Sequence, residues 1–179
     1  MIPDYRDGSL YHQKQGNGKN CGATSFAVAV NILLRENKYL DNVAIWSSKA
    51  FNKDSTGLLN TKGTKWLEMN GLSSKMAIER VSGDIHYTSQ MRAQLELGRM
   101  VIISSGSKSV WQHADGTQEV DGHSSGHWIV FYYYANGVYY ANDSSKSPEK
   151  GAGCPYTEAQ MQQWLDGRSS HAATVVYLK

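Results

Sequence analysis

The stretch that decides the fold is Gln15-Gly16-Asn17-Gly18-Lys19-Asn20-Cys21-Gly22-Ala23-Thr24-Ser25, which leads straight into a helical pattern. After the cysteine, apolar residues recur at the spacing of one buried helical face, namely at Ala23, Phe26, Ala27, Val30, Leu33 and Leu34. This pattern predicts a helix that begins at Cys21 and runs to about Glu36. Asn20 is the expected N-cap, because its side-chain carbonyl oxygen can accept an unpaired amide of the first turn.

A cysteine at the start of a helix is well placed to act as a nucleophile. The unpaired N–H groups and the helix dipole favour a negative charge there, which lowers the pKa of a thiol and raises its thiolate fraction. The glycines around Cys21 let a substrate backbone come close. Most lone cysteines are nevertheless small buried hydrophobic residues, so catalysis requires a base, an orienting group and an oxyanion donor elsewhere in the chain.

Length and charge argue against several classes of protein. The 179 residues suit a single domain spanning residues 1–179, the net charge is +2, and lysines and arginines are scattered. We therefore expect no nucleic-acid partner, and the longest apolar run, from Trp128 to Ala135, is too short to span a membrane. The first residues lack the pattern of a signal peptide, so we expect a cytoplasmic protein or one delivered by a non-classical secretion or phage route.

The two cysteines, Cys21 and Cys154, are too few for a disulfide framework in a chain of this length, and both are expected to be free thiols. Cys154, which precedes Pro155, is expected to be an inert thiol in a loop. No cofactor or metal is expected. His123 and His127 have the i, i+4 spacing of helical zinc ligands, but they lie in a Ser/Gly-rich segment that enters a strand.

Helical patterns come first along the chain and strand patterns second, which predicts an α+β fold with a mostly antiparallel sheet. Residues 15–104 are expected to form the helical part and residues 105–179 the sheet part. Further helices are expected at residues 41–52, 58–69, 88–97 and 158–165, and strands at residues 76–81, 99–104, 128–134, 138–142 and 173–178. Residues 5–19, 105–125 and 144–153 are expected to be loops, the second of them a long loop or an irregular hairpin.

His127 is the favoured base among six histidines, because it starts a central strand directly after the flexible Ser124-Ser125-Gly126. Asp143, at the end of the next strand, is the expected orienting residue. A two-residue turn at Asn136-Gly137 would place these two side chains on opposite faces of the sheet. A three-residue loop at 135–137 would pair Ile129 with Asp143 and place both side chains on one face, so we expect the three-residue loop.

These residues suffice for nucleophilic catalysis. Neutral His127 takes the proton of Cys21, or stabilises a thiolate–imidazolium pair, and later protonates the leaving amine. Asp143 holds the tautomer of the imidazole. The side-chain amide of Gln15 and the backbone N–H of Cys21 would form the oxyanion hole, and Gln13 competes with Gln15 for that role.

A glutamine six residues before Cys-Gly-Ala at a helix start resembles the papain-like cysteine peptidases. Three further stretches resemble the bacteriocin-processing (double-glycine leader) peptidase-like family of that superfamily: Leu97-Gly98-Arg99-Met100-Val101-Ile102-Ile103, Gly126-His127-Trp128-Ile129-Val130 and Gly137-Val138-Tyr139-Tyr140-Ala141-Asn142-Asp143. The resemblance implies N-terminal helices that carry the cysteine and pack against a sheet that carries the histidine and the aspartate. It also implies catalytic roles for Gln15, Cys21, His127 and Asp143. Ser144 stands where the family usually has a proline.

The expected function is a cysteine peptidase or amidase that hydrolyses an amide bond through a thioester, on a peptide, a protein or a peptidoglycan peptide. A toxin or phage hydrolase would suit these features, and an inhibitor or immunity protein is an expected partner. An acyltransferase with the same residues, or a binding module that kept the fold without catalysis, is the alternative. The expected substrate contacts are Gly22, Gly126, Trp128 and Trp111. His113 and His123 are further candidates for the cleft, and a solvated loop is the alternative for these two and for Trp111.

Overall fold

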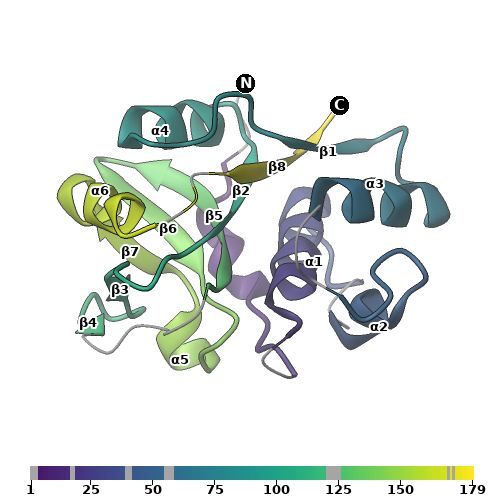
Figure 1. Cartoon of the computed structure of the whole chain (residues 1–179), viewed down its shortest axis with the longest axis horizontal. Helices are drawn as coiled ribbons and strands as arrows, with labels where there is room; N and C mark the ends of the chain where they lie inside the picture. The colour runs from purple at the N-terminus through teal and green to yellow at the C-terminus, as the bar shows by residue number, and fades with distance from the viewer. Residues whose placement is uncertain are drawn as a thin grey trace.

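A six-stranded antiparallel sheet with the strand order β1-β8-β2-β5-β6-β7 forms the centre of this computed structural model (Figure 1). The structure describes residues 4–16, 19–38, 42–54, 59–119, 126–168, 170 and 172–179. The strands of the sheet are β1 (Met76–Arg80), β2 (Met100–Ser104), β5 (Trp128–Ala135), β6 (Val138–Asn142), β7 (Cys154–Thr157) and β8 (Ala173–Leu178). A separate two-stranded ribbon pairs β3 (Trp111–Gln112) with β4 (Gln118–Glu119).

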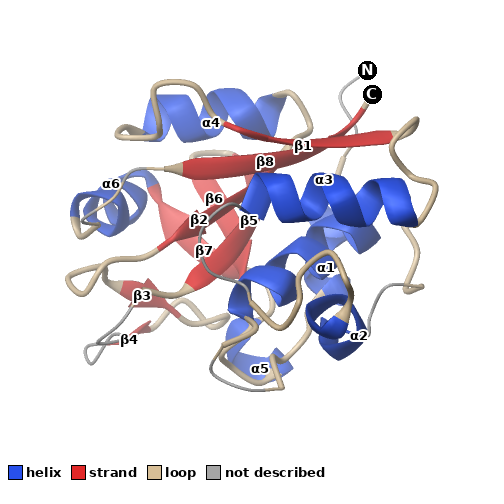
Figure 2. Ribbon diagram, turned by 45° about the vertical axis from the view of Figure 1, so that its right-hand side comes forward, coloured by secondary structure: helices blue, strands red, loops and turns tan. Residues whose placement is uncertain are grey.

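Helices cover both faces of this sheet. They are η1 (Arg6–Tyr11, a 3-10 helix), α1 (Cys21–Leu34), α2 (Asn42–Ser47), α3 (Leu59–Met69), α4 (Thr88–Glu96), α5 (Pro148–Gly151) and α6 (Glu158–Asp166). Figures 1 and 2 show α1 to α3 on one side of the sheet and α4 and α6 on the other. The predicted α+β fold with an antiparallel sheet is therefore confirmed.

Each face of the sheet has its own hydrophobic core. On the side of α1, Phe26 packs edge-on against Trp66 of α3, with ring centroids 5.5 Å apart, and Val130 of β5 belongs to the same cluster. On the side of α6, Trp164 packs against Phe131 at 5.6 Å. Neighbouring residues of β5 thus alternate between the two cores, as the two-residue period of a strand requires. Helix α1 lies between the sheet and α2, and its residues from Cys21 to Leu33 are all buried.

Several expected boundaries differ from the observed ones. Helix α2 is shorter than the expected range 41–52, and the expected loop 5–19 contains the 3-10 helix η1. The expected loop 144–153 contains α5, and Cys154 lies in strand β7 rather than in a loop. Asn20 is the N-cap residue of α1, but its side chain makes no capping hydrogen bond. Of these elements, β7 forms by pairing with β6, a contact that its own four residues do not indicate.

The sheet is also not confined to residues 105–179, because β1 and β2 come earlier in the chain and pair with β8. The expected division at residue 104 therefore does not separate helices from strands. Among the described residues, no helix is long and apolar enough to cross a membrane.

The hairpin between β5 and β6 closes with a two-residue turn, not with the expected three-residue loop. Ala135 pairs with Val138, and the two turn residues Asn136 and Gly137 have positive φ angles of 51° and 78°. This is the turn that Asn-Gly favours. Further along, an extra residue, Tyr132, interrupts the pairing as a β-bulge, so that Val130 lies opposite Asn142. The bulge restores the register that the three-residue loop was expected to provide.

Candidate active site

Cys21 is the first residue of α1, and its thiol is hydrogen-bonded to the side chain of His127. Burial, which leaves 8% of the residue exposed, by itself raises the pKa of a thiol. The hydrogen bond to His127 and its charge act in the opposite direction, together with the backbone N–H groups of Trp128 and Gly22. These interactions outweigh burial, and the pKa of Cys21 is lowered.

His127 immediately precedes β5 and is held by the neighbouring strand. Its backbone N–H donates to Ser105 Oγ at 3.2 Å, and its carbonyl oxygen accepts from Ser105 N at 2.9 Å. Its ring Nε2 lies 2.8 Å from Asp143 Oδ1. Because Nε2 is hydrogen-bonded to the carboxylate of Asp143, Nδ1 is the ring nitrogen that is left to interact with Cys21. Burial lowers the pKa of the imidazole, but the hydrogen bonds to Asp143 and Cys21 outweigh it and raise the pKa to about 9.

Asp143 follows β6 and is 1% exposed. Burial raises the pKa of this carboxyl, but hydrogen bonds from His127 and Ser145 outweigh burial and lower it. Oδ1 accepts from Nε2 of His127 and also from the backbone N and Oγ of Ser145, at 3.0 and 2.7 Å. The side chain is therefore an ionised acceptor that keeps the Nε2–H tautomer of His127.

The backbone of Asp143 is fixed by two residues from other segments. Its N–H donates to Gly151 O at 2.8 Å, and its carbonyl oxygen accepts from His12 Nε2 at 2.8 Å. Gly151 must lack a side chain here, because a Cβ atom would lie 2.4 Å from the carbonyl oxygen of Asp143. His12 was not among the expected site residues, and nothing in the sequence around it indicates this contact.

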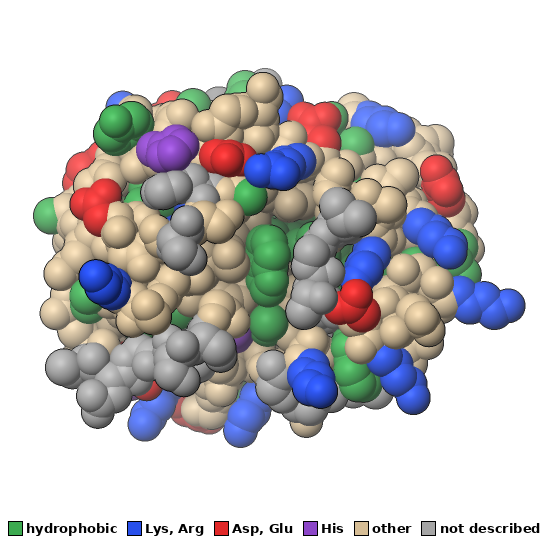
Figure 3. All heavy atoms as spheres, in the orientation of Figure 1, with side chains coloured by type: hydrophobic (Ala, Val, Ile, Leu, Met, Phe, Trp, Pro, Cys, Tyr) green, Lys and Arg blue, Asp and Glu red, His purple; other side chains and the backbone are tan. Residues whose placement is uncertain are grey.

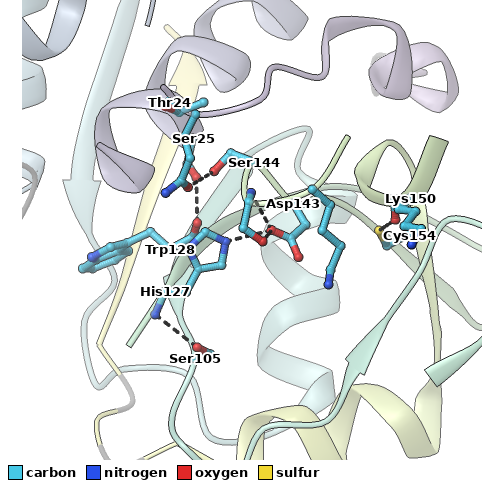
Figure 4. A network of polar contacts seen from close by, with 12 residues as sticks. Thr24, Ser25, Ser105, His127, Trp128, Asp143, Ser144, Lys150 and Cys154 are labelled. Atoms are coloured by element: carbon cyan, nitrogen blue, oxygen red, sulfur yellow. Dashed lines mark hydrogen bonds and ion pairs between the residues drawn. The ribbon is translucent and has the colours of Figure 1, made fainter. Parts of the chain in front are cut away.

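Gln15 lies beside the segment that carries Asp143. Its backbone N–H donates to Ser144 O at 2.8 Å, and its side-chain Oε1 accepts from Ser144 Oγ at 2.9 Å. Figure 4 shows Ser144 next to Asp143, with His127 and Ser25 nearby. Gln13, the competing candidate, is buried with 7% of its surface exposed. The structure thus joins Cys21 to His127 and His127 to Asp143, and it places Gln15 against Ser144, the residue after Asp143.

Trp111 does not line an open cleft, which corrects its expected role as a substrate contact. It is 0% exposed and lies in the core between the sheet and α6. Its ring centroid is 5.4 Å from that of His127, and Trp164 packs edge-on against it at 5.8 Å. Trp111 therefore supports the imidazole from the protein interior. Its position in a Ser/Gly-rich segment suggested exposure, but the short pairing of β3 with β4 places it in the core.

Trp128, the residue after His127 in the chain, is half-buried and borders a pocket of about 560 Å³. The other lining residues are Leu59, Asn60, Arg80, Ser104, Ser170, Ala172 and Thr174. On the face drawn in Figure 3, hydrophobic side chains lie in a groove between the sheet and helices α1 to α3. Of the two glycines expected to contact substrate, Gly126 is exposed and Gly22 is buried in α1.

Cys154 is a different kind of thiol. It is 0% exposed, and its Sγ donates to Lys150 O at 3.4 Å. Burial and the charge of Asp143 raise the pKa of Cys154 to about 12, so it stays protonated. Figure 4 shows Cys154 and Lys150 set apart from His127, and both cysteines are free.

Within the described ranges, no group of three or more His, Cys, Asp or Glu side chains is arranged to hold a metal ion. His123 lies outside the described residues. His113 is half-buried, and its Nε2 lies 3.6 Å from Glu119 Oε2, which also forms an ion pair with Lys146.

No protein-family model matches the sequence. No curated protein matches it by sequence either. Among solved structures, the chain resembles one from Bacillus anthracis described as a candidate C39-like peptidase, with a TM-score of 0.54 and 13% identity over 97% of this chain and 94% of that one. It is also similar to a double-glycine motif protease from an AMS/PCAT transporter in complex with the leader peptide, with a TM-score of 0.46 and 13% identity over 93% and 88% of the two chains. The predicted papain-like type of fold, with helices packed against an antiparallel sheet, is therefore confirmed.

Proposed function

We propose that this chain is a cysteine peptidase that hydrolyses amide bonds of peptides, with Cys21 as nucleophile, His127 as general acid and base, and Asp143 as the orienting group. One observation carries the proposal. A buried imidazole lies between an ionised carboxylate, at 2.8 Å, and a thiol whose pKa is lowered. This arrangement favours the thiolate–imidazolium pair, because each charge stabilises the other in a site that is largely shielded from water.

The chemistry proceeds in two steps. The Cys21 thiolate attacks the amide carbon, the C–S bond forms, and the amine leaves with a proton from His127. Water then attacks the thioester, gives a proton to His127, and the acid leaves as the thiolate is restored. Gln15 and the backbone N–H of Cys21 donate to the oxyanion in both steps, since the first amides of a helix have no partner within the helix.

The pocket at Trp128 suits part of an extended peptide. The pocket is lined by Trp128, which follows His127 in the chain, and by polar groups from Asn60, Thr174 and Arg80. A side chain of the peptide next to the cleaved bond would occupy this pocket. The indole offers apolar contact, and the surrounding polar groups offer hydrogen bonds.

Selective alkylation of the cysteines tests the proposal. The wild type is treated with limiting iodoacetamide at pH 6, and with a peptide epoxide, and the modified cysteine is mapped by mass spectrometry. We expect Cys21 to react about 100-fold faster than Cys154, because the pKa of Cys21 is lowered whereas that of Cys154 is raised. His127→Ala should lower the Cys21 rate at least about tenfold, since the imidazolium partner is gone.

Cys154→Ser is the matched control, and it should leave the rate at Cys21 unchanged. Equal, slow rates at both cysteines would overturn the proposal and indicate a binding module without catalysis. Release of soluble amines from purified peptidoglycan, compared with cleavage of a library of linear peptides, then separates a wall amidase from the peptidase proposed here.

A further inference from the structure

Two consecutive residues make contacts in different parts of the candidate site. Asp143 accepts from His127 Nε2 at 2.8 Å, and the next residue, Ser144, donates from Oγ to Gln15 Oε1 at 2.9 Å. The first contact concerns the base and the second concerns the candidate oxyanion donor. Figure 4 shows Ser144 above the ring of His127 and Asp143 to the right of that ring.

In the structure, Ser144 contacts the oxygen end of the Gln15 side-chain amide. An amide side chain has one end that accepts hydrogen bonds and one that donates them. With Oε1 bound by the Ser144 hydroxyl, Nε2 is turned away from Ser144. The reversed amide would present an oxygen to a developing negative charge, which would destabilise the transition state.

Ser144 is also well placed to hold this orientation. It is 3% exposed, so water competes little for its hydroxyl. A second link runs through the backbone, where Gln15 N donates to Ser144 O at 2.8 Å. Gln15 is thus attached at both its backbone and its side chain to the residue that follows Asp143.

We propose that Ser144 is a positioning residue that orients the Gln15 amide as an oxyanion donor, so that the dipeptide Asp143-Ser144 aligns the base and the oxyanion hole together. This rests on the proposed function and adds to it a residue that acts through Gln15. Alanine, valine or proline at position 144 has no hydroxyl to offer, whereas threonine keeps one.

Two reactions of Cys21 separate this role from others. Acylation by p-nitrophenyl acetate passes through a tetrahedral oxyanion: the Cys21 thiolate forms a C–S bond, and p-nitrophenolate leaves with the electrons of the broken C–O bond. Alkylation by iodoacetamide displaces iodide and forms no oxyanion. We expect Ser144→Ala to slow acylation about tenfold and to change alkylation less than about twofold. Removing a whole oxyanion donor slows a reaction by about 10²–10³-fold, and Ser144→Ala only leaves that donor less well oriented.

A double-mutant cycle with Gln15→Ala tests whether Ser144 acts through Gln15. In the Gln15→Ala background, Ser144→Ala should have no further effect on acylation. If Ser144→Ala loses stability, Ser144→Thr and Ser144→Val form a second pair of equal size, of which only the threonine variant should retain the faster acylation.

The outcomes are distinct. Equal losses in acylation and alkylation, additive effects with Gln15→Ala, or equal rates for the threonine and valine variants would each overturn the role of Ser144. A wild type in which iodoacetamide does not prefer Cys21 would instead overturn the proposed function itself.

Discussion

Val130 lies opposite Asn142 in the sheet, one residue away from the pairing that the two-residue turn at Asn136 and Gly137 would give by itself. The bulge at Tyr132 makes the difference. Because side chains alternate between the faces of a strand, this single step decides whether the residues at the ends of β5 and β6 meet. With the bulge, His127 and Asp143 lie on one side and form a hydrogen bond of 2.8 Å.

The bulged residue Tyr132 packs closely against Gly8 of η1, and Gly8→Ala should disturb the bulge. Tyr132 is 2% exposed, and a Cβ atom on Gly8 would lie 2.3 Å from its ring. We expect a loss of about 1–3 kcal/mol in the free energy of unfolding, as for other overpacked sites, and slower alkylation of Cys21. Urea denaturation and timed labelling measure the two effects.

Gly126→Ala is the stability control for this variant, because its added Cβ would meet only Ser105 O at 3.6 Å. Equal stability of the two alanine variants would contradict the role given to Gly8.

Asp143→Asn should change the pH dependence of Cys21 alkylation. The carboxylate helps to raise the pKa of His127, and an amide carries no charge, so the imidazolium becomes less stable and the thiolate loses its partner. We expect the acid limb of the rate profile to move up by about one pH unit or more. Asp115→Asn, in an exposed turn, should leave the profile unchanged. A profile that is the same in Asp143→Asn and wild type would refute the orienting role.

The His127–Asp143 pair should stabilise the fold in a defined pH range. The Cys21→Ala variant and the Cys21→Ala/His127→Gln double variant are compared. The difference between their free energies of unfolding measures the contribution of the His127–Asp143 pair in the absence of the thiol. Asp143 favours the imidazolium in the folded state, so the stabilisation is complete below the unfolded pKa of about 6.5 and is lost as pH rises through the higher folded value. Urea titrations at pH 6 and pH 9.5 measure it. A difference that grows with pH would mean that burial, which lowers the pKa of His127, is the stronger effect.

Ser25→Ala should loosen the contact between α1 and β5. Ser25 Oγ donates to Trp128 O at 3.1 Å. The backbone N–H of the same residue, Trp128, helps to lower the pKa of Cys21. We expect a loss of about 1 kcal/mol in unfolding free energy and a measurable fall in the alkylation rate of Cys21. Ser48→Ala removes a hydroxyl that donates to Ile45 O at 2.6 Å within one turn of the chain, and it should leave alkylation unchanged. If both serine variants slow alkylation equally, the Ser25 contact has no special role.

Local patterns in the sequence were sufficient for the elements that carry the candidate site. The helical spacing after Cys21 predicted α1, because a buried helix shows its period within a few turns. The aromatic and β-branched runs on either side of Asn136 and Gly137 predicted β5 and β6, since that dipeptide favours a tight turn. The order glutamine, cysteine, histidine and aspartate indicated which side chains would have to meet.

Only the tertiary structure decided how they meet. The bulge at Tyr132 and the buried position of Trp111 are features of the folded chain. The contacts of Ser144 with Gln15 and of His12 with Asp143 join segments that are 129 and 131 residues apart. No local period encodes such contacts, because their free energy arises only after both segments are packed against the same sheet. The sequence by itself determined the chemical groups and the elements that carry them, and the packing of distant segments determined their register and orientation.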